Sequence, residues 1–262
     1  MRHLPAGVVL TLALAALLPC GSARSAPLPG WGTWETTLLP RDINGDGSVD
    51  AFYDTVLDLT WLANANAGAG SVYDSTRYST ATDGRMNWVN ANAWAASLDV
   101  YGISGWRLPK TLDTGRPGCD WSNAGGTDCG YNVQTLSADG RTVYSEMAHL
   151  YYVSLGNRGA CAPGDVACPN RPQWLQTNSG DFENLESYVY WSASTVANPA
   201  PAAWSFSFGN GVQDGHTQPL EFQAWAVRPG DVPNNVMPEP NSLALLMLAF
   251  GAATLAVGRR RC

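Results

Sequence analysis

The segment Phe222-Gln223-Ala224-Trp225-Ala226-Val227-Arg228 is the last of three strand-like runs in this 262-residue chain. The other two runs are 188–194 and 203–208, and Gly209-Asn210-Gly211, directly after the second, is typical of a hairpin turn. Aromatic and β-branched residues bounded by glycine, proline or asparagine indicate strands. The sequence therefore predicts an antiparallel sheet in the last third of the chain.

Two helices are predicted before these strands. Asn87 is a suitable N-cap for the first helix, and the second is predicted to begin after Ser145. His149 is expected to point to solvent, away from the apolar face of the second helix. Helices followed by antiparallel strands indicate an α+β fold. The expected apolar positions are Val89, Ala93 and Ala96 in the first helix, and Met147, Leu150, Tyr151 and Leu155 in the second.

The region before the helices has less regular patterning. Two strand-like runs, 34–39 and 51–62, are separated by a polar segment, which predicts a β-hairpin with a long loop. Residues 64–84 are rich in alanine, glycine, serine and asparagine, and this composition predicts an irregular loop. Trp106-Arg107-Leu108-Pro109 is expected to be extended, because the residue before a proline avoids the helical region.

Both ends of the chain carry apolar runs. Residues 1–26 combine basic residues, an apolar stretch and small residues, which predicts a secretory signal peptide. Residues 243–257 form the second run; as a helix they would rise about 22 Å, less than the hydrocarbon core of a bilayer. A short transmembrane segment followed by arginines predicts a transient, cleavable membrane anchor. Residues 27–49 are assigned to an N-terminal strand and loop, and 231–237 to a linker.

The region between these ends is acidic. The whole chain has 15 lysines and arginines against 22 aspartates and glutamates. The end segments hold several of the arginines but, of the carboxylates, only Glu239. Phosphate backbones and anionic lipids repel such a surface. Nucleic acid is therefore excluded as a partner.

The four cysteines outside the end segments are Cys119, Cys129, Cys161 and Cys168. In an exported protein an even number of cysteines indicates disulfides. Of the three connectivities that four cysteines allow, short loop closure favours 119 with 129 and 161 with 168. Zinc is the alternative, but these spacings do not match those of a zinc knuckle.

Residues 42–50, Asp-Ile-Asn-Gly-Asp-Gly-Ser-Val-Asp, have the spacing of a calcium-binding loop, with oxygen ligands at positions 1, 3, 5, 7 and 9 and glycine at position 6. Tyr53 stands at position 12, where an EF-hand carries a bidentate carboxylate. A plain acidic turn is the alternative, because asparagine, aspartate and glycine also form tight turns. A bound calcium ion would be structural. Its expected ligands are Asp42, Asn44, Asp46, Ser48, Asp50 and Asp54.

A set of short motifs over residues 50–230, taken in order, resembles the Lcl C-terminal domain family. This resemblance implies a C-type-lectin-like fold with two helices and a twisted antiparallel sheet. It also implies long loops between these elements. The insertion after Pro109, residues 112–140, carries the first cysteine pair and departs from the family pattern, in which a helix follows almost directly. The motifs are Thr60-Trp61-Leu62, Trp88 and Trp94, Gly105-Trp106-Arg107-Leu108-Pro109, 190–195, Ala203-Trp204, Phe208-Gly209-Asn210-Gly211 and Val227-Arg228.

The C-terminal residues 238–262 resemble a PEP-CTERM sorting signal. Pro238-Glu239-Pro240 is followed by the apolar run and then by Arg259-Arg260-Arg261. The resemblance implies recognition by an exosortase in the inner membrane, cleavage near the Pro-Glu-Pro motif, and release to the cell surface or an exopolysaccharide matrix. An ordinary tail anchor is the alternative.

The chain has 11 tryptophans, which either fill the core or offer platforms for sugar rings. Trp121 and Trp174 lie inside the cysteine-bearing loops and are the candidates for exposed ligand contacts. The tryptophans on strand-like segments are expected in the core. These are Trp61, Trp106, Trp191, Trp204 and Trp225.

Motifs for catalysis are absent from the sequence between the end segments. Only His149 and His216 remain there, and the segment contains no nucleophile elbow, metal-binding helix or phosphate loop. The sequence therefore predicts an exported surface or matrix protein that binds a ligand such as a glycan, or promotes adhesion, without catalysis. A structural matrix component and an enzyme acting on an extracellular polymer are the alternatives.

Overall fold

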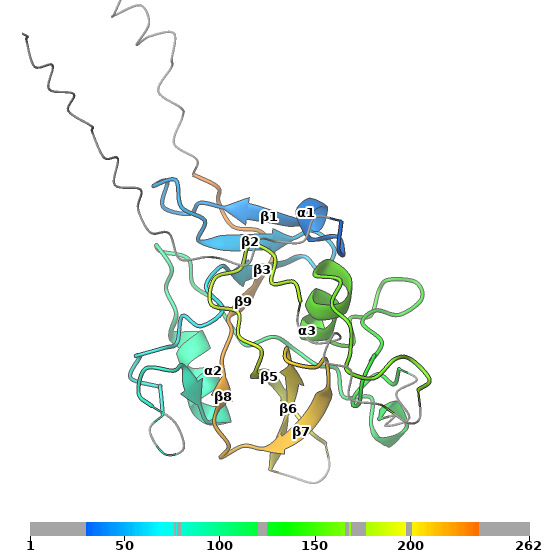
Figure 1. Ribbon diagram of the computed structural model, residues 1–262. Helices are drawn as coiled ribbons and strands as arrows, with labels where there is room; N and C mark the ends of the chain where they lie inside the picture. The colour runs from blue at the N-terminus through cyan, green and yellow to red at the C-terminus, as the bar shows by residue number, and fades with distance from the viewer. Residues whose placement is uncertain are drawn as a thin grey trace, which may run out of the picture.

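The computed structural model describes residues 30–235, apart from residue 76 and the ranges 78–79, 120–124, 166–167, 169–176 and 198–200. Within them the chain forms two sheets, drawn one above the other in Figure 1. The four-stranded sheet has the order β1 (Leu38–Arg41), β2 (Ala51–Asp54), β3 (Leu59–Leu62) and β9 (Val227–Pro229). The five-stranded sheet has the order β4 (Arg85–Met86), β8 (Phe222–Gln223), β5 (Val189–Thr195), β6 (Ala202–Ser207) and β7 (Gln213–Thr217).

The helices are few and short. The longest is α2 (Trp88–Ser97), and α3 (Glu146–His149) continues as a π-helix, η2 (Leu150–Ser154). α1 (Trp34–Thr37) precedes β1, and a 3-10 turn, η1 (Arg116–Gly118), lies in the loop after Pro109. The predicted α+β class is therefore confirmed. The strands form two sheets, and all their pairs are antiparallel except β5 with β8.

One segment, residues 222–229, belongs to both sheets. It contributes β8 to the five-stranded sheet, here called the lower sheet, and β9 to the four-stranded sheet, here called the upper sheet. Trp225 lies between the two strands and has no exposed surface. The Trp225 ring centroid lies 5.0 Å from that of Trp61 in β3 and 5.9 Å from that of Tyr190 in β5. Its indole N–H donates to the carbonyl of Leu62 at 2.8 Å. Trp225 therefore packs against both sheets at once.

The extended segment 106–111 ties this crossing to the second helix. Arg107 exchanges two backbone hydrogen bonds of 2.8 Å with Val227 in β9. Its guanidinium donates two bonds of 2.8 Å to the carboxylate of Glu146 in α3, and that carboxylate also accepts from the Lys110 N–H at 2.7 Å. The Ser192 hydroxyl and the Ala193 N–H, both in β5, donate to the Pro109 carbonyl. The predicted extended conformation thus connects β9, α3 and β5.

The N-terminal hairpin is present with different boundaries. The predicted strand 34–39 begins as α1, because the Thr33 carbonyl accepts the N–H groups of Thr36 and Thr37 and closes a helical turn. The predicted strand 51–62 is a second hairpin, β2 with β3. The Asp54 carboxylate accepts from the N–H groups of Val56 and Leu57, which turns the chain between these strands.

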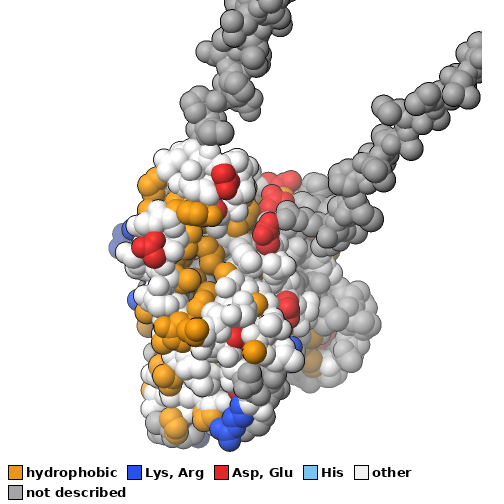
Figure 2. Space-filling model, turned by 90° about the vertical axis from the view of Figure 1, so that its left-hand side faces the viewer, with side chains coloured by type: hydrophobic (Ala, Val, Ile, Leu, Met, Phe, Trp, Pro, Cys, Tyr) orange, Lys and Arg blue, Asp and Glu red, His pale blue; other side chains and the backbone are white. Residues whose placement is uncertain are grey.

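The first predicted helix has the expected cap and a different buried face. The Asn87 side chain accepts from the Asn90 N–H at 3.0 Å. The face is set by the large indoles, because Trp94 is buried and the Trp88 indole N–H donates to the Ser192 carbonyl. The predicted core positions Val89, Ala93 and Ala96 are exposed, whereas Ala91, Trp94 and Ala95 are buried. The side of the molecule that carries α2 faces the viewer in Figure 2, and apolar side chains gather there in a band.

The second predicted helix is buried on more sides than expected. Met147, Leu150, Tyr151 and Leu155 are buried as predicted, and the Ser145 hydroxyl caps the helix by accepting from the Ala148 N–H. The prediction that His149 points to solvent is wrong: only 1% of it is exposed. Thr135, in the insertion after Pro109, lies against the imidazole, with 3.4 Å between its Oγ1 and the ring Nδ1. The insertion therefore covers the face expected to be open.

The last third of the chain follows the sequence prediction closely. The three strand-like runs become β5, β6 and β8 with β9, and the Gly209-Asn210-Gly211 turn connects β6 to β7. β7 was not predicted, because Gln-Asp-Gly-His-Thr lacks the alternation of apolar and polar residues that indicates a strand. As an edge strand, β7 has little need of this alternation. The tryptophans expected in the core are all buried: Trp61, Trp106, Trp191, Trp204 and Trp225.

The buried imidazole predicts a pH-dependent stability. Burial lowers the pKa of His149 from 6.5 to about 4. The unfolded chain therefore binds a proton below pH 6.5 that the folded protein rejects until about pH 4. The free energy of unfolding should fall over this range by up to about 3 kcal/mol from this residue alone.

Urea unfolding of wild type and His149→Gln at pH 7, 5.5 and 4 measures this contribution. The stability difference between the two proteins should shift against wild type as the pH falls, because the variant lacks the titrating ring. Asp54, whose pKa is raised by burial, titrates in both proteins and cancels in the comparison. Parallel pH profiles would contradict a buried neutral imidazole.

Candidate functional site

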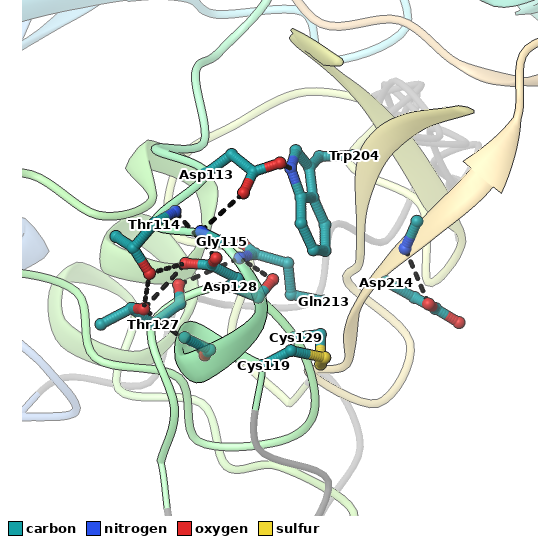
Figure 3. Close-up of a disulfide and its surroundings, with 12 residues drawn as sticks. Asp113, Thr114, Gly115, Cys119, Thr127, Asp128, Cys129, Trp204, Gln213 and Asp214 are labelled. Carbon is teal, nitrogen blue, oxygen red and sulfur yellow. Dashed lines mark hydrogen bonds between the residues drawn. A yellow bond between two sulfur atoms is a disulfide. The ribbon is translucent and has the colours of Figure 1, made fainter. Parts of the chain in front are cut away.

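A cleft lies beside the Cys119–Cys129 disulfide, at the lower sheet (Figure 3). Its volume is about 630 Å³. One wall comes from the insertion after Pro109, and the other from the end of β5 and from β6. The lining residues are Asp113, Gly115, Arg116, Cys119, Asp128, Val196, Ala197 and Trp204.

Asp113 joins the two walls of this cleft. One carboxylate oxygen accepts from the Gly115 N–H at 2.9 Å, within its own wall. The other accepts from the opposite wall, from the Ala197 N–H at 2.7 Å and the Trp204 indole N–H at 3.3 Å. The indole is therefore fixed by its nitrogen, and its hydrocarbon part borders the cleft together with Val196.

Asp128 fixes the loop behind the cleft and is 1% exposed. Its carboxylate accepts from the Thr114 N–H and hydroxyl, both at 2.8 Å, and from the Thr127 hydroxyl at 2.7 Å. The Gln213 side-chain amide donates to the Asp128 carbonyl at 2.7 Å, and Gln213 exchanges two backbone bonds with Gly130. The edge strand β7 thus holds the insertion in place.

The predicted disulfide pairing is confirmed. Cys119 pairs with Cys129 and Cys161 with Cys168, with Cα–Cα distances of 4.6 and 4.8 Å. The first bridge closes the loop that forms the cleft wall. Cys161 lines a second, smaller hollow of about 300 Å³ with Tyr152 and Arg158. Each disulfide joins cysteines that are close in the sequence, so each one closes a short local loop.

One cluster near β7 resembles a nucleophilic triad in its residue types. Ser205 Oγ lies 2.9 Å from His216 Nδ1, and Asp214 Oδ2 lies 4.0 Å from His216 Nε2. Ser205 is 1% exposed and its hydroxyl also contacts the Asp214 carbonyl at 3.1 Å, in line with the β6–β7 register. A hydroxyl buried in a strand pair cannot reach a polymer substrate. The cluster therefore supports the strand pairing and offers no accessible nucleophile.

The acidic loop, residues 42–50, contains all the predicted metal ligands except Asp54. The Asp42 carboxylate accepts from the N–H groups of Gly45, Asp46 and Gly47, at 2.6 to 3.2 Å. In the same loop the Asp50 carboxylate accepts from the Ile43 N–H at 2.8 Å. Such bonds position the oxygens and also stabilise a turn without a metal.

Other predicted ligands divide between the acidic loop and the strand after it. The Asp46 carboxylate accepts from the Asn44 amide and from the Ser48 N–H and hydroxyl, and these contacts lower its pKa. Asp54 lies apart: it is fully buried in β2 and its carboxylate accepts from Val56 and Leu57. Within the described part of the chain, no group of three or more histidine, cysteine, aspartate or glutamate side chains could hold a metal ion.

Several predicted functional residues lie outside the described residues. These are Trp121, Trp174, the sorting motif Pro238-Glu239-Pro240, the signal segment 1–26 and the apolar run 243–257. Among residues whose structure is described, no helix has the length and apolar character needed to cross a bilayer.

The sequence analysis did not identify the residues that shape the cleft. Asp113 and Asp128 belong to the insertion, where single aspartates among glycines and threonines look like turn residues. Trp204 was assigned to the core, and it is indeed buried while one part of it lines the cleft. In the sequence, only the pair Cys119 and Cys129 indicated that this loop has a fixed structure.

Asp128→Ala should destabilise the protein by about 2 kcal/mol, because it removes a buried carboxylate that accepts from the Thr114 N–H and from two hydroxyls. Urea unfolding with the disulfides intact measures this loss. Asp139→Ala is the matched control: Asp139 also bonds a nearby hydroxyl, that of Ser137, but its side chain is 61% exposed. The control should lose about 0.5 kcal/mol or less. Equal losses would show that the loop behind the cleft is not fixed by Asp128.

Comparison of the chain with protein-family models, with curated proteins and with solved structures found no match. The resemblances to the Lcl C-terminal domain family and to PEP-CTERM signals therefore stay hypotheses, as does the C-type-lectin-like fold.

Proposed function

We propose that this chain is an exported, surface- or matrix-associated protein whose folded domain binds a glycan in the cleft beside Cys119–Cys129, without catalysis. The observation that carries the binding proposal is the cleft itself. It has a volume of about 630 Å³, which is within the range of small-ligand sites, and Asp113 ties its two walls together. A cleft held open by such bonds needs little ordering when a ligand binds.

The chemistry of the lining favours a neutral or amine-bearing ligand rich in hydroxyl groups. Asp113 Oδ1 accepts from Gly115 and has capacity for a second donor, such as a sugar hydroxyl. The indole of Trp204 with Val196 and Ala197 provides an apolar surface for the C–H groups of a sugar ring. Among the described lining residues, Asp113 and Asp128 outnumber the one cation, Arg116, and this balance disfavours anionic polymers.

The arrangement of the chain ends supports a surface role. The described chain begins beside α1 and ends after β9, both at the four-stranded sheet, whereas the cleft lies at the five-stranded sheet (Figure 1). A domain anchored through its C-terminus would therefore present the cleft away from its attachment. Disulfide formation agrees with export to an oxidising compartment.

The remaining parts of the proposal concern export and calcium. Residues 1–26 direct secretion, and an exosortase cleaves near Pro238-Glu239-Pro240 after transient anchoring in the inner membrane through residues 243–257. The domain is of the C-type-lectin-like, Lcl C-terminal type. A calcium ion, where bound, is structural and sits in the acidic loop. The spacing of oxygen-bearing residues in the sequence of this loop, from Asp42 to Asp50, supports this part.

Binding of residues 27–238 to neutral, aminated and anionic oligosaccharides tests the proposal. Wild type should bind a neutral or aminated oligosaccharide, and Asp113→Asn should weaken binding about tenfold through loss of a charged acceptor. Trp121→Ala or Trp174→Ala should weaken binding by a similar factor if these residues contact the sugar. Asp139→Asn is the control and should bind as wild type.

The other outcomes separate the alternatives. Absence of binding to any oligosaccharide, together with bulk association with matrix polymer, would favour a structural matrix component. Turnover of a polymer would favour an enzyme. The same titrations in millimolar calcium and in chelator decide the metal question, because equal thermal stability in both would show that the acidic loop is only a turn.

A further inference from the structure

The residues after β9 do not leave the domain at once. Residues 231–235, here called the strap, lie along the acidic loop. The Asn235 N–H donates to the Asp42 carbonyl at 2.7 Å, and the Asn235 side-chain amide donates to the Ile43 carbonyl. The Asp42 N–H donates to the side-chain oxygen of Asn234 at 3.0 Å. The strap therefore pairs with the loop through both backbone and side chains.

An ion pair fixes the start of the strap. Arg41 donates to both carboxylate oxygens of Asp231, at 2.7 and 2.8 Å. The Arg41 side chain is only 12% exposed, and this contact lowers the pKa of Asp231. Val232, the next residue, is buried. A bidentate pair with one largely buried partner is stronger than an ordinary surface pair.

Gly45 allows the strap to lie this close. Its φ is +77°, and a Cβ at this position would come within 2.7 Å of the Asn235 carbonyl oxygen. A side chain here would be strained and would push the strap away. Gly45 is therefore required both by the turn of the acidic loop and by the close approach of the strap.

Asp42 links the fold of the loop to closure of the strap. Its carboxylate holds the N–H groups of Gly45 and Gly47 inside the loop. Its own backbone N–H and carbonyl hold Asn234 and Asn235. A change that disorders the loop around the Asp42 side chain moves the backbone on which the strap depends.

We propose that the strap and the acidic loop form one coupled unit, which controls how far along the C-terminal segment the contacts with the domain extend. With the strap bound, the described contacts extend to Asn235; with the loop disordered, they end near Val232, because Arg41 still holds Asp231. Pro238 lies three positions beyond Asn235, so the strap sets the access of a processing enzyme to the sorting motif. This last role rests on the proposed function, whereas the coupling does not.

Amide hydrogen exchange on the full chain tests the coupling. Asp42→Ala, a change in the loop, should speed exchange of the Asn235 N–H about tenfold or more. Asp231→Ala, a change in the strap, should speed exchange of the Gly47 N–H several-fold, because coupling is reciprocal. Asp139→Ala is the control and should change neither amide.

The Val227 N–H, bonded to Arg107 at 2.8 Å, reports on global unfolding and should keep its protection. Unchanged exchange of Asn235 in Asp42→Ala overturns the proposal. If Asp42→Ala also exposes Val227, the Asp231→Ala variant decides: release of Asn235 with unchanged Gly47 means that strap and loop are independent. In cells, coupled exchange together with unaltered processing in Asp42→Ala would reject the sorting role alone.

Discussion

The structure depends on a single segment, 222–229, that is a strand in both sheets. Its midpoint is Trp225, whose ring contacts Trp61 in the upper sheet and Tyr190 in the lower one. Phe182 and Phe208 complete the surroundings, with ring centroids 4.8 and 5.7 Å from Trp225. The buried hydrophobic residues of both sheets form one cluster around this indole, so the two sheets share one core.

Around this core the chain places its functional features at opposite ends. The insertion after Pro109 is attached to the lower sheet through Gln213 and forms the cleft with Trp204. At the upper sheet, Arg41 and Asp42 receive the last described residues of the chain. The binding site that we propose and the strap thus lie on opposite sides of the core. Changes in one need not disturb the other.

Features that are encoded by residues close together in the sequence could be predicted, whereas contacts between distant segments could not. The strands around Trp191, Trp204 and Trp225, the Asn87 cap and both disulfide pairings follow from neighbouring residues, and all were predicted. The burial of His149 and the cleft at Asp113 arise where the insertion folds back over α3 and β6, and no short-range pattern encodes that contact. The composition of the strap, one proline and two asparagines, predicts a linker, whereas its partners lie about 190 positions earlier in the sequence.

The shared core is tested most directly by hydrogen exchange in Trp225→Ala, with Trp225→Phe as the milder change. The Ala63 N–H, bonded to the Asp50 carbonyl, reports on the upper sheet, and the Phe208 N–H, bonded to the Tyr188 carbonyl, reports on the lower one. If one core supports both sheets, the two amides lose protection together and by the same factor. Loss of protection in one sheet with the other unchanged would contradict the account.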